Sequence, residues 1–206
     1  MKLYYSPGAC SLSPHIVARE LGLPVELSKV IFSAEGRTTE EGENFYEVNP
    51  RGGYVPAFRL DDGSVLLEGP AIVQYLADQA PEKGLLPERA SRAYYDTVSW
   101  LTFISSELHK GFSPLYSNPS AEEAAKIISR LETRIAVVER ALEGTEYLLG
   151  STFTVADCYL YTILRWTGRF GIALADYPNA QAFVERMETR AAVQQALAEE
   201  GLEAVA

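Results

Sequence analysis

Strand patterns and helical patterns occupy different parts of this chain, and that division limits its fold most strongly. Short apolar runs bounded by turn residues occur only before residue 81, interleaved with two helical stretches. The expected order is strand, helix, strand, hairpin and helix, at residues 2–5, 11–21, 25–32, 55–60 with 64–67, and 71–78. The first three elements fit the length of a βαβ unit, so their two strands should be parallel.

After Pro81–Arg89, a stretch with prolines, glycine and mixed charges, apolar residues recur at helical spacing only. Two helix starts carry a capping-box pattern, one at Ser120 with Glu123 and one at Thr154 with Asp157. Further helices are expected at about 91–110 and 179–200.

The predicted fold class is therefore α/β plus all-α. An N-terminal thioredoxin-like βαβ-ββα domain with a four-stranded sheet is expected at 1–81, a linker at 82–90, and an all-helical domain at 91–206. Ser33–Asn44 is polar, acidic and glycine-containing, so we expect a surface loop there with at most one turn of helix.

The charge of the chain argues against nucleic acid as a partner. There are 18 Lys and Arg residues against 28 Asp and Glu, a formal net charge of −10, and no cluster of basic residues. Neither a secretory signal nor an apolar run of membrane-spanning length is present, so no membrane partner is expected. The two cysteines, Cys10 and Cys158, lie in segments of opposite character, which disfavours a disulfide and favours the cytoplasm.

Cys10 is the strongest candidate for chemistry. It follows a strand, lies in a Pro-Gly loop and precedes a helix, where the positive end of the helix dipole and unpaired N–H groups favour a thiolate. The alternative is a small packing residue, because unpaired cysteines are often simply buried. No second cysteine follows in Cys-Ser-Leu-Ser, so dithiol chemistry is not expected.

Two further segments could hold a peptide-like ligand. Val55-Pro56 begins a strand, and a cis peptide there would turn the Val55 backbone toward a ligand. The residues alone favour an ordinary strand-start proline, since few X-Pro bonds are cis. Glu68-Gly69-Pro70 places a carboxylate beside a helix N-terminus, which suits an amino-acid group or simply the helix dipole.

One face of the 91–110 helix is polar, because Thr102, Ser106 and His109 recur at helical spacing and Lys110 follows. The spacing alone favours a solvated face on which the histidine caps carbonyls. His15 is expected to be structural, and with two distant histidines no metal site is predicted.

These segments together resemble the beta-class glutathione transferases of bacteria. The resemblance rests on five stretches in the family's order, covering almost the whole chain: Met1-Lys-Leu-Tyr-Tyr-Ser-Pro-Gly-Ala-Cys10-Ser-Leu, Asn49-Pro-Arg-Gly52 with Val55-Pro-Ala57, Glu68-Gly69, Glu107-Leu-His-Lys-Gly-Phe-Ser-Pro-Leu115, and Phe153-Thr-Val-Ala-Asp157.

The resemblance implies a homodimeric enzyme that conjugates glutathione, its co-substrate, to electrophilic and often hydrophobic molecules without a metal. It implies that Cys10 and His109 flank the glutathione sulfur and that Val55 pairs with the tripeptide backbone. It further implies that Glu68 and Gly69 hold the γ-glutamyl end. The remaining implied contacts come from the first long helix of the partner subunit, at Thr102, Ser106, Glu107, Leu108, His109 and Lys110.

The chain departs from the family pattern in three places. Thr102 stands where asparagine is frequent, and the loop that usually supplies a lysine to the glycyl carboxylate is longer, so Arg37 is assigned that role. The segment before Val55-Pro56 is one residue longer than usual.

Two other functions stay open at this point. Cys10 could form a mixed disulfide with glutathione and give thiol transferase or reductase activity, or the chain could be a non-catalytic ligand-binding relative. The electrophile pocket is expected in the second domain, with Tyr116, Trp166 and Phe170 as candidate walls.

Overall fold

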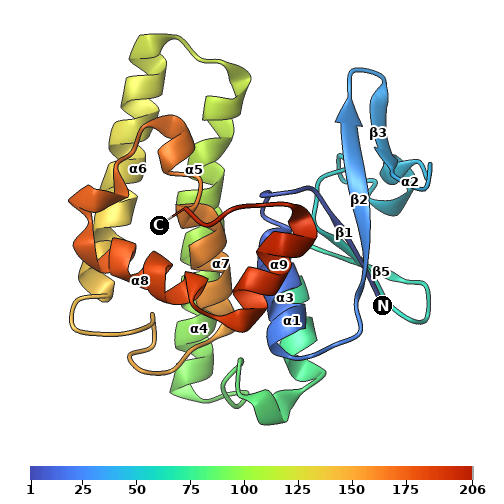
Figure 1. The fold of residues 1–206 in the computed structure, drawn as a ribbon, viewed down its shortest axis with the longest axis horizontal. Helices are drawn as coiled ribbons and strands as arrows, with labels where there is room; N and C mark the ends of the chain where they lie inside the picture. The colour runs from blue at the N-terminus through green and yellow to red at the C-terminus, as the bar shows by residue number, and fades with distance from the viewer. Residues whose placement is uncertain (206) are drawn as a thin grey trace. The chain divides into compact units, whose positions relative to one another are not determined.

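The computed structural model describes residues 1–205, and its contacts group the chain into two units (Figure 1). The first contains Met1–Gly84 and Arg190–Ala204, and the second contains Leu85–Thr189 and Val205. The last helix thus groups with the first unit, whereas the sequence assigned it to the helical domain; the expected boundaries at 81 and 91 stay a prediction. No helix within residues 1–205 is long and apolar enough to cross a membrane.

The first unit is built on a five-stranded sheet of order β3-β2-β1-β4-β5. Its strands are β1 (Lys2–Tyr5), β2 (Glu26–Ser33), β3 (Gly36–Thr39), β4 (Ala57–Arg59) and β5 (Val65–Leu67). β1 and β2 are parallel, as expected for a βαβ unit, and the other neighbours are antiparallel.

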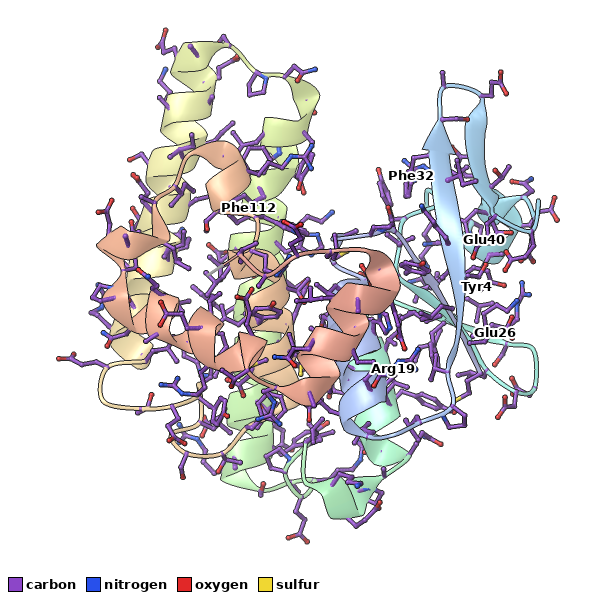
Figure 2. The ribbon with its side chains drawn as sticks, viewed as in Figure 1. Tyr4, Arg19, Glu26, Phe32, Glu40 and Phe112 are labelled. Carbon is purple, nitrogen blue, oxygen red and sulfur yellow. The ribbon has the colours of Figure 1, made fainter. Side chains whose placement is uncertain are left out.

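The helices of this unit bury both faces of the sheet. They are α1 (Leu12–Glu20), α2 (Phe45–Val48), α3 (Gly69–Asp78) and α9 (Ala191–Glu200). α1 packs against both α3 and α9 (Figure 1), while Phe45 and Val48 of α2 pack on Tyr4 and Val30 of the sheet. Figure 2 shows Tyr4 within this sheet.

The expected four-stranded sheet and the expected loop at 33–44 were both wrong. β3 pairs antiparallel with β2 as an outer hairpin, from Val30 opposite Thr39 to Ser33 opposite Gly36. Both strands of the hairpin are largely solvent-exposed, so the alternation that marks a half-buried strand is absent from the sequence. The β-branched pair Thr38-Thr39 is the local signal that favours a strand there.

A buried polar network joins α9 to α1. The His15 ring is fully buried, with Nδ1 2.9 Å from Glu200 Oε1 and Nε2 2.6 Å from Glu199 Oε2. Glu200 also accepts a hydrogen bond from the Gly8 N–H at 2.9 Å, in the loop that leads to Cys10. His15 is structural, as predicted, and holds the chain's last helix against its first.

The second unit is helical. Its helices are α4 (Arg92–Phe103), a π-helical segment (Ile104–His109), α5 (Lys110–Phe112), α6 (Ala121–Ala141), α7 (Val155–Leu164) and α8 (Pro178–Glu188). Both predicted capping boxes are present, at Ser120 with Glu123 and at Thr154 with Asp157. Phe112, labelled in Figure 2, is 1% exposed in the core of this unit.

Candidate functional site

Cys10 and Val55 are brought together by neighbouring strands of the sheet. Cys10 follows β1 and Val55 precedes β4, and these strands pair so that Tyr4 lies opposite Ala57. The Cys10 thiol is 9% exposed and donates a hydrogen bond to the Val55 carbonyl at 3.2 Å. The Val55–Pro56 peptide is cis. A carbonyl acceptor stabilises the protonated thiol, because a thiolate cannot donate.

The loop around Cys10 is held by residues that sequence reasoning missed. The Ser11 hydroxyl accepts from the Ser6 N–H at 3.1 Å and donates to the Ser6 carbonyl at 3.3 Å. Ser11 is fully buried and is the N-cap of α1, so it fixes the backbone next to Cys10. The Ser11 side chain makes no capping hydrogen bond to α1, so the helix start alone gave no signal for its contacts with Ser6.

Glu68 and Gly69 lie at the N-terminus of α3, as expected. Glu68 is exposed and has φ 74° and ψ 121°, a conformation that only glycine adopts readily. Its carbonyl accepts hydrogen bonds from Ala71 and Ile72, which begin the helix. A non-glycine residue keeps such a strained backbone only where the surrounding structure enforces it, and residues of this kind are concentrated at binding and active sites.

Arg37 binds the loop at Gly52 and Gly53 and has further N–H donors that are not used in this contact. Its Nη1 donates to the carbonyls of Gly52 and Gly53, the second at 2.6 Å. The guanidinium also lies over Phe32 and Tyr54, 5.0 and 4.7 Å from the ring centroids. Its Nε–H and Nη2–H groups have no acceptor within residues 1–205, so a carboxylate could still bind there.

In the second unit, some residues of the predicted 102–110 site are exposed and others are buried. Thr102, Ser106 and Lys110 are exposed, and the Thr102 hydroxyl donates to the Val98 carbonyl at 2.8 Å. Leu108 is fully buried, backbone included, so the structure leaves none of its surface exposed to a ligand.

Ser106, Glu107 and Lys110 line a cavity of about 260 Å³ together with residues of α6. Glu107 forms an ion pair with Arg134 at 2.7 Å, and Arg130 lies nearby in the same lining. Three cations against one carboxylate make this cavity basic, although the chain as a whole is acidic.

His109 ends the π-helical segment and faces α7. Its Nδ1 lies 2.7 Å from the hydroxyl oxygen of Tyr159, which is 2% exposed. Burial, with a smaller contribution from the charge of Lys110, lowers the pKa of His109 to about 4. The ring is therefore neutral at pH 7. Tyr159 carried no sequence signal, because it lies in an uninterrupted buried helix.

The three candidate wall residues of the electrophile pocket do lie together. Tyr116 and Phe170 have ring centroids 5.1 Å apart, and Tyr116 and Trp166 6.2 Å apart. Trp166 in turn lies edge-on to the His109 ring at 5.1 Å. An aromatic wall thus continues from His109, which suits a flat apolar substrate.

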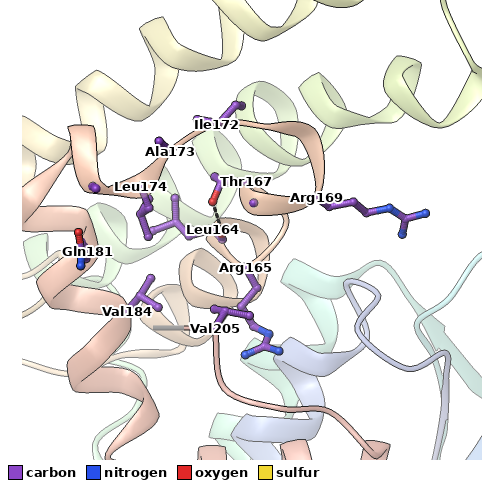
Figure 3. A pocket seen from close by; sticks show the side chains of 12 residues that line it. Leu164, Arg165, Thr167, Arg169, Ile172, Ala173, Leu174, Gln181, Val184 and Val205 are labelled. Atoms are coloured by element: carbon purple, nitrogen blue, oxygen red, sulfur yellow. Dashed lines mark hydrogen bonds between the residues drawn. The ribbon is translucent and has the colours of Figure 1, made fainter.

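The larger cavity of this unit, about 550 Å³, contains none of the predicted site residues (Figure 3). Its lining is mainly apolar, from Leu164 to Val184, and is completed by Val205. The Arg165 guanidinium at its edge is already paired with Glu188 at 3.1 Å. In the described part of the chain, no group of three His, Cys, Asp or Glu residues is arranged to hold a metal ion.

Comparison with known proteins gives two family matches. Residues 8–79 match the family model described as "Glutathione S-transferase, N-terminal domain", and residues 100–191 match "Glutathione S-transferase, C-terminal domain". The chain is similar to Glutathione S-transferase GstA of Escherichia coli O157:H7, with 43% identity covering 98% of this chain and all of that one.

Solved structures are similar over the same length. A ternary complex of BphK, described as a bacterial GST, is 52% identical with a TM-score of 0.93, covering 98% of this chain and 100% of that one. A sphingomonad glutathione S-transferase complexed with glutathione is 44% identical with a TM-score of 0.92, again covering 98% and 100%.

Proposed function

Because this chain belongs to the glutathione S-transferase family, we propose that Cys10 holds the sulfur of bound glutathione while that sulfur attacks an electrophilic carbon. The observation that carries the proposal is the contact of the Cys10 thiol with the Val55 carbonyl. The thiol lies beside the backbone of Val55, with which we expect the tripeptide backbone to pair. The arrangement supports membership of the beta class.

The rest of the glutathione contacts follow from the chemistry of the exposed groups. Glu68 accepts the ammonium of the γ-glutamyl group, and the backbone N–H groups at Gly69 and beyond receive its carboxylate. Arg37 receives the glycyl carboxylate through the N–H groups that the loop carbonyls leave unused. The exposed Thr102, Ser106 and Lys110 add contacts from the partner subunit.

The chemical step needs no metal. The glutathione sulfur forms a bond to an activated carbon, such as that of an aromatic halide or an epoxide, while the carbon–halogen or carbon–oxygen bond breaks. The thiol proton passes to solvent, or to the alkoxide of an opened epoxide. The protein contributes by orienting the sulfur and by donating hydrogen bonds to its developing charge, from His109 and from Cys10, whose single S–H turns from the Val55 carbonyl to the glutathione sulfur.

Conjugation of glutathione to a panel of aromatic halides and epoxides tests this function. Cys10→Ala and His109→Ala should each lower kcat/KM at least tenfold, because each removes a donor to the sulfur. Cys158→Ala is the matched control, since it changes the chain's other cysteine, a fully buried one on α7. Unchanged activity in both site variants would remove the proposal.

Two further experiments on the wild-type protein distinguish the proposal from thiol transferase activity and from a non-catalytic binding role. After incubation with oxidised glutathione, mass spectrometry should show no adduct on Cys10, because the contact with Val55 favours the thiol over the attacking thiolate. An adduct abolished by Cys10→Ser would instead indicate thiol transferase chemistry. A protein that fails to bind immobilised glutathione would be a non-catalytic relative.

We assign the chain a homodimeric, cytoplasmic role in detoxifying hydrophobic electrophiles. The absence of a disulfide at Cys10 and Cys158 suits a reducing compartment. The aromatic wall beside His109 suits an apolar electrophile.

A further inference from the structure

The His109 ring is fixed by one specific polar contact. Its Nδ1 lies 2.7 Å from the hydroxyl oxygen of Tyr159, and the two rings are perpendicular with centroids 6.0 Å apart. Tyr159 comes from α7 and is 2% exposed, so its hydroxyl is held in a packed helix. Trp166 packs edge-on against the His109 ring, with centroids 5.1 Å apart, and Phe112 packs in turn on Trp166, with centroids 5.8 Å apart.

The direction of this hydrogen bond follows from the acidity of the two groups. A phenol, with a pKa near 10, is a stronger acid than a neutral imidazole N–H, and the unprotonated imidazole nitrogen is the stronger base. A hydrogen bond is strongest when the better acid donates to the better base, so the Tyr159 O–H donates to Nδ1. Since the ring is neutral, its single proton is then on Nε2.

The opposite edge of the ring is available to a ligand. Nε2 makes no hydrogen bond to any residue from 1 to 205. Among these residues, the Ser13 hydroxyl is the one side-chain polar atom that is both buried and without a partner, so the unpaired Nε2 of His109 is not buried. The protonated Nε2 is therefore accessible from solvent.

We propose that Tyr159 is a positioning residue that donates to His109 Nδ1 and so keeps the proton on Nε2, where it is donated to the glutathione sulfur. The inference rests on the proposed function and adds a residue and a direction of donation to it. His109 acts as a hydrogen-bond donor to the charged sulfur and not as the base that removes the thiol proton.

The tautomer can be measured directly by ¹⁵N NMR of the ligand-free protein. The chain has two histidines, so His109→Gln identifies the signals of His109 by their loss. Wild-type protein at pH 7 should show a protonated Nε2 and an unprotonated Nδ1. Tyr159→Phe should give a mixture of tautomers, because the donor to Nδ1 is gone.

Tyr161→Phe is the matched control. It removes a buried tyrosine hydroxyl from the same helix, one that contacts Glu188 and Arg165 and not His109. It should leave the tautomer and the kinetics unchanged. Tyr159→Phe should lower kcat about tenfold, as loss of the partner that orients a functional histidine commonly does, with little change in KM for glutathione. In a His109→Gln background the same change should have no further effect.

A proton on Nδ1 in the wild-type protein would overturn the inference, as would an unchanged tautomer in Tyr159→Phe. Equal losses of kcat in Tyr159→Phe and Tyr161→Phe would also overturn it, because they would indicate a general packing effect. The expected tautomer in a protein without conjugation activity would refute the proposed function alone. Normal conjugation with the other tautomer would refute the role of Tyr159 alone.

Discussion

At the scale of single residues, Glu68 combines a proposed ligand-binding role with an unfavourable backbone conformation. Its φ of 74° costs a non-glycine residue about 1–3 kcal/mol, while glycine loses about 0.4–1 kcal/mol through the entropy of the unfolded chain. Glu68→Gly should therefore stabilise the protein by about 1 kcal/mol in urea unfolding. The KM for glutathione should rise about tenfold or more, since a charge-assisted hydrogen bond is lost.

Ala90 provides the control for this prediction. It also has positive φ, 67°, and lies outside the predicted glutathione site. Ala90→Gly should stabilise the protein similarly without changing KM. If Glu68→Gly destabilised the chain while Ala90→Gly stabilised it, strain at Glu68 would be excluded. Glu68→Gln, which keeps the side-chain length, should raise KM with little effect on stability.

The buried His109 makes stability depend on pH. Its pKa is about 4 in the folded protein and 6.5 when exposed, so between these values the unfolded chain binds more protons than the folded one. The contribution of the neutral His109 to the free energy of unfolding is therefore fully present above pH 6.5. It is lost as the pH drops toward 4, and the shift in pKa corresponds to about 3 kcal/mol.

Urea unfolding of the wild-type protein and His109→Gln at pH 7, 5.5 and 4 checks this prediction. As the pH falls over this range, the free energy of unfolding of the wild-type protein should decrease more than that of His109→Gln. Because His15 and all carboxylates are present in both proteins, their contributions cancel. A difference that stays constant with pH would show that His109 titrates normally.

At the scale of elements, Arg37 connects the β2–β3 hairpin to the loop before Val55. Its planar guanidinium donates to two carbonyls of that loop and stacks between Phe32 and Tyr54, which a lysine ammonium cannot reproduce. Arg37→Lys should therefore speed hydrogen exchange in the loop and raise KM for glutathione severalfold. Arg19→Lys, which alters an arginine of the same unit that is paired with Glu199 instead of with loop carbonyls, is the control.

The elements also show what the sequence could predict and why. Both capping boxes were predictable, since they depend on residues three positions apart along one chain segment. β3 and the π-helical segment were not. An exposed hairpin has no buried face to impose alternation, and a π turn changes the face on which His109 lies without changing the apolar spacing around it.

At the scale of the whole molecule, contacts set by sheet topology were predictable and contacts set by long-range packing were not. Cys10 and Val55 meet because they flank paired ends of β1 and β4, an arrangement implicit in the βαβ-ββα order. Gly8 and Glu200 are 192 positions apart, and nothing local indicates that the last helix returns to the cysteine loop. Likewise, only the packing of α7 reveals Tyr159 beside His109.

The proposed site is shared between two subunits, and mixed dimers can test this. Glu68→Ala removes a contact from the first unit of a chain, whereas Ser106→Glu places a negative charge on the exposed helix face expected to reach the partner's ligand. At a glutathione concentration well below the KM of either variant, each variant alone should be nearly inactive as a homodimer of two 22.7 kDa chains. In a symmetric dimer, one mixed pair contains one site with both defects and one site with neither.

Co-expression of the two variants in equal amounts should therefore restore about a quarter of wild-type activity, since half of the dimers are mixed and each has one intact site of two. Wild-type chains co-expressed with the Glu68→Ala/Ser106→Glu double variant give the control: every site of a mixed dimer there contains one defect, so activity should be only the quarter that comes from wild-type homodimers, whereas sites built within one chain would give about half. If all contacts came from a single chain, the first mixture would stay as inactive as its parents. Recovery thus requires that Ser106 act on the glutathione held by the other subunit, which is the arrangement that makes dimerisation a condition of activity.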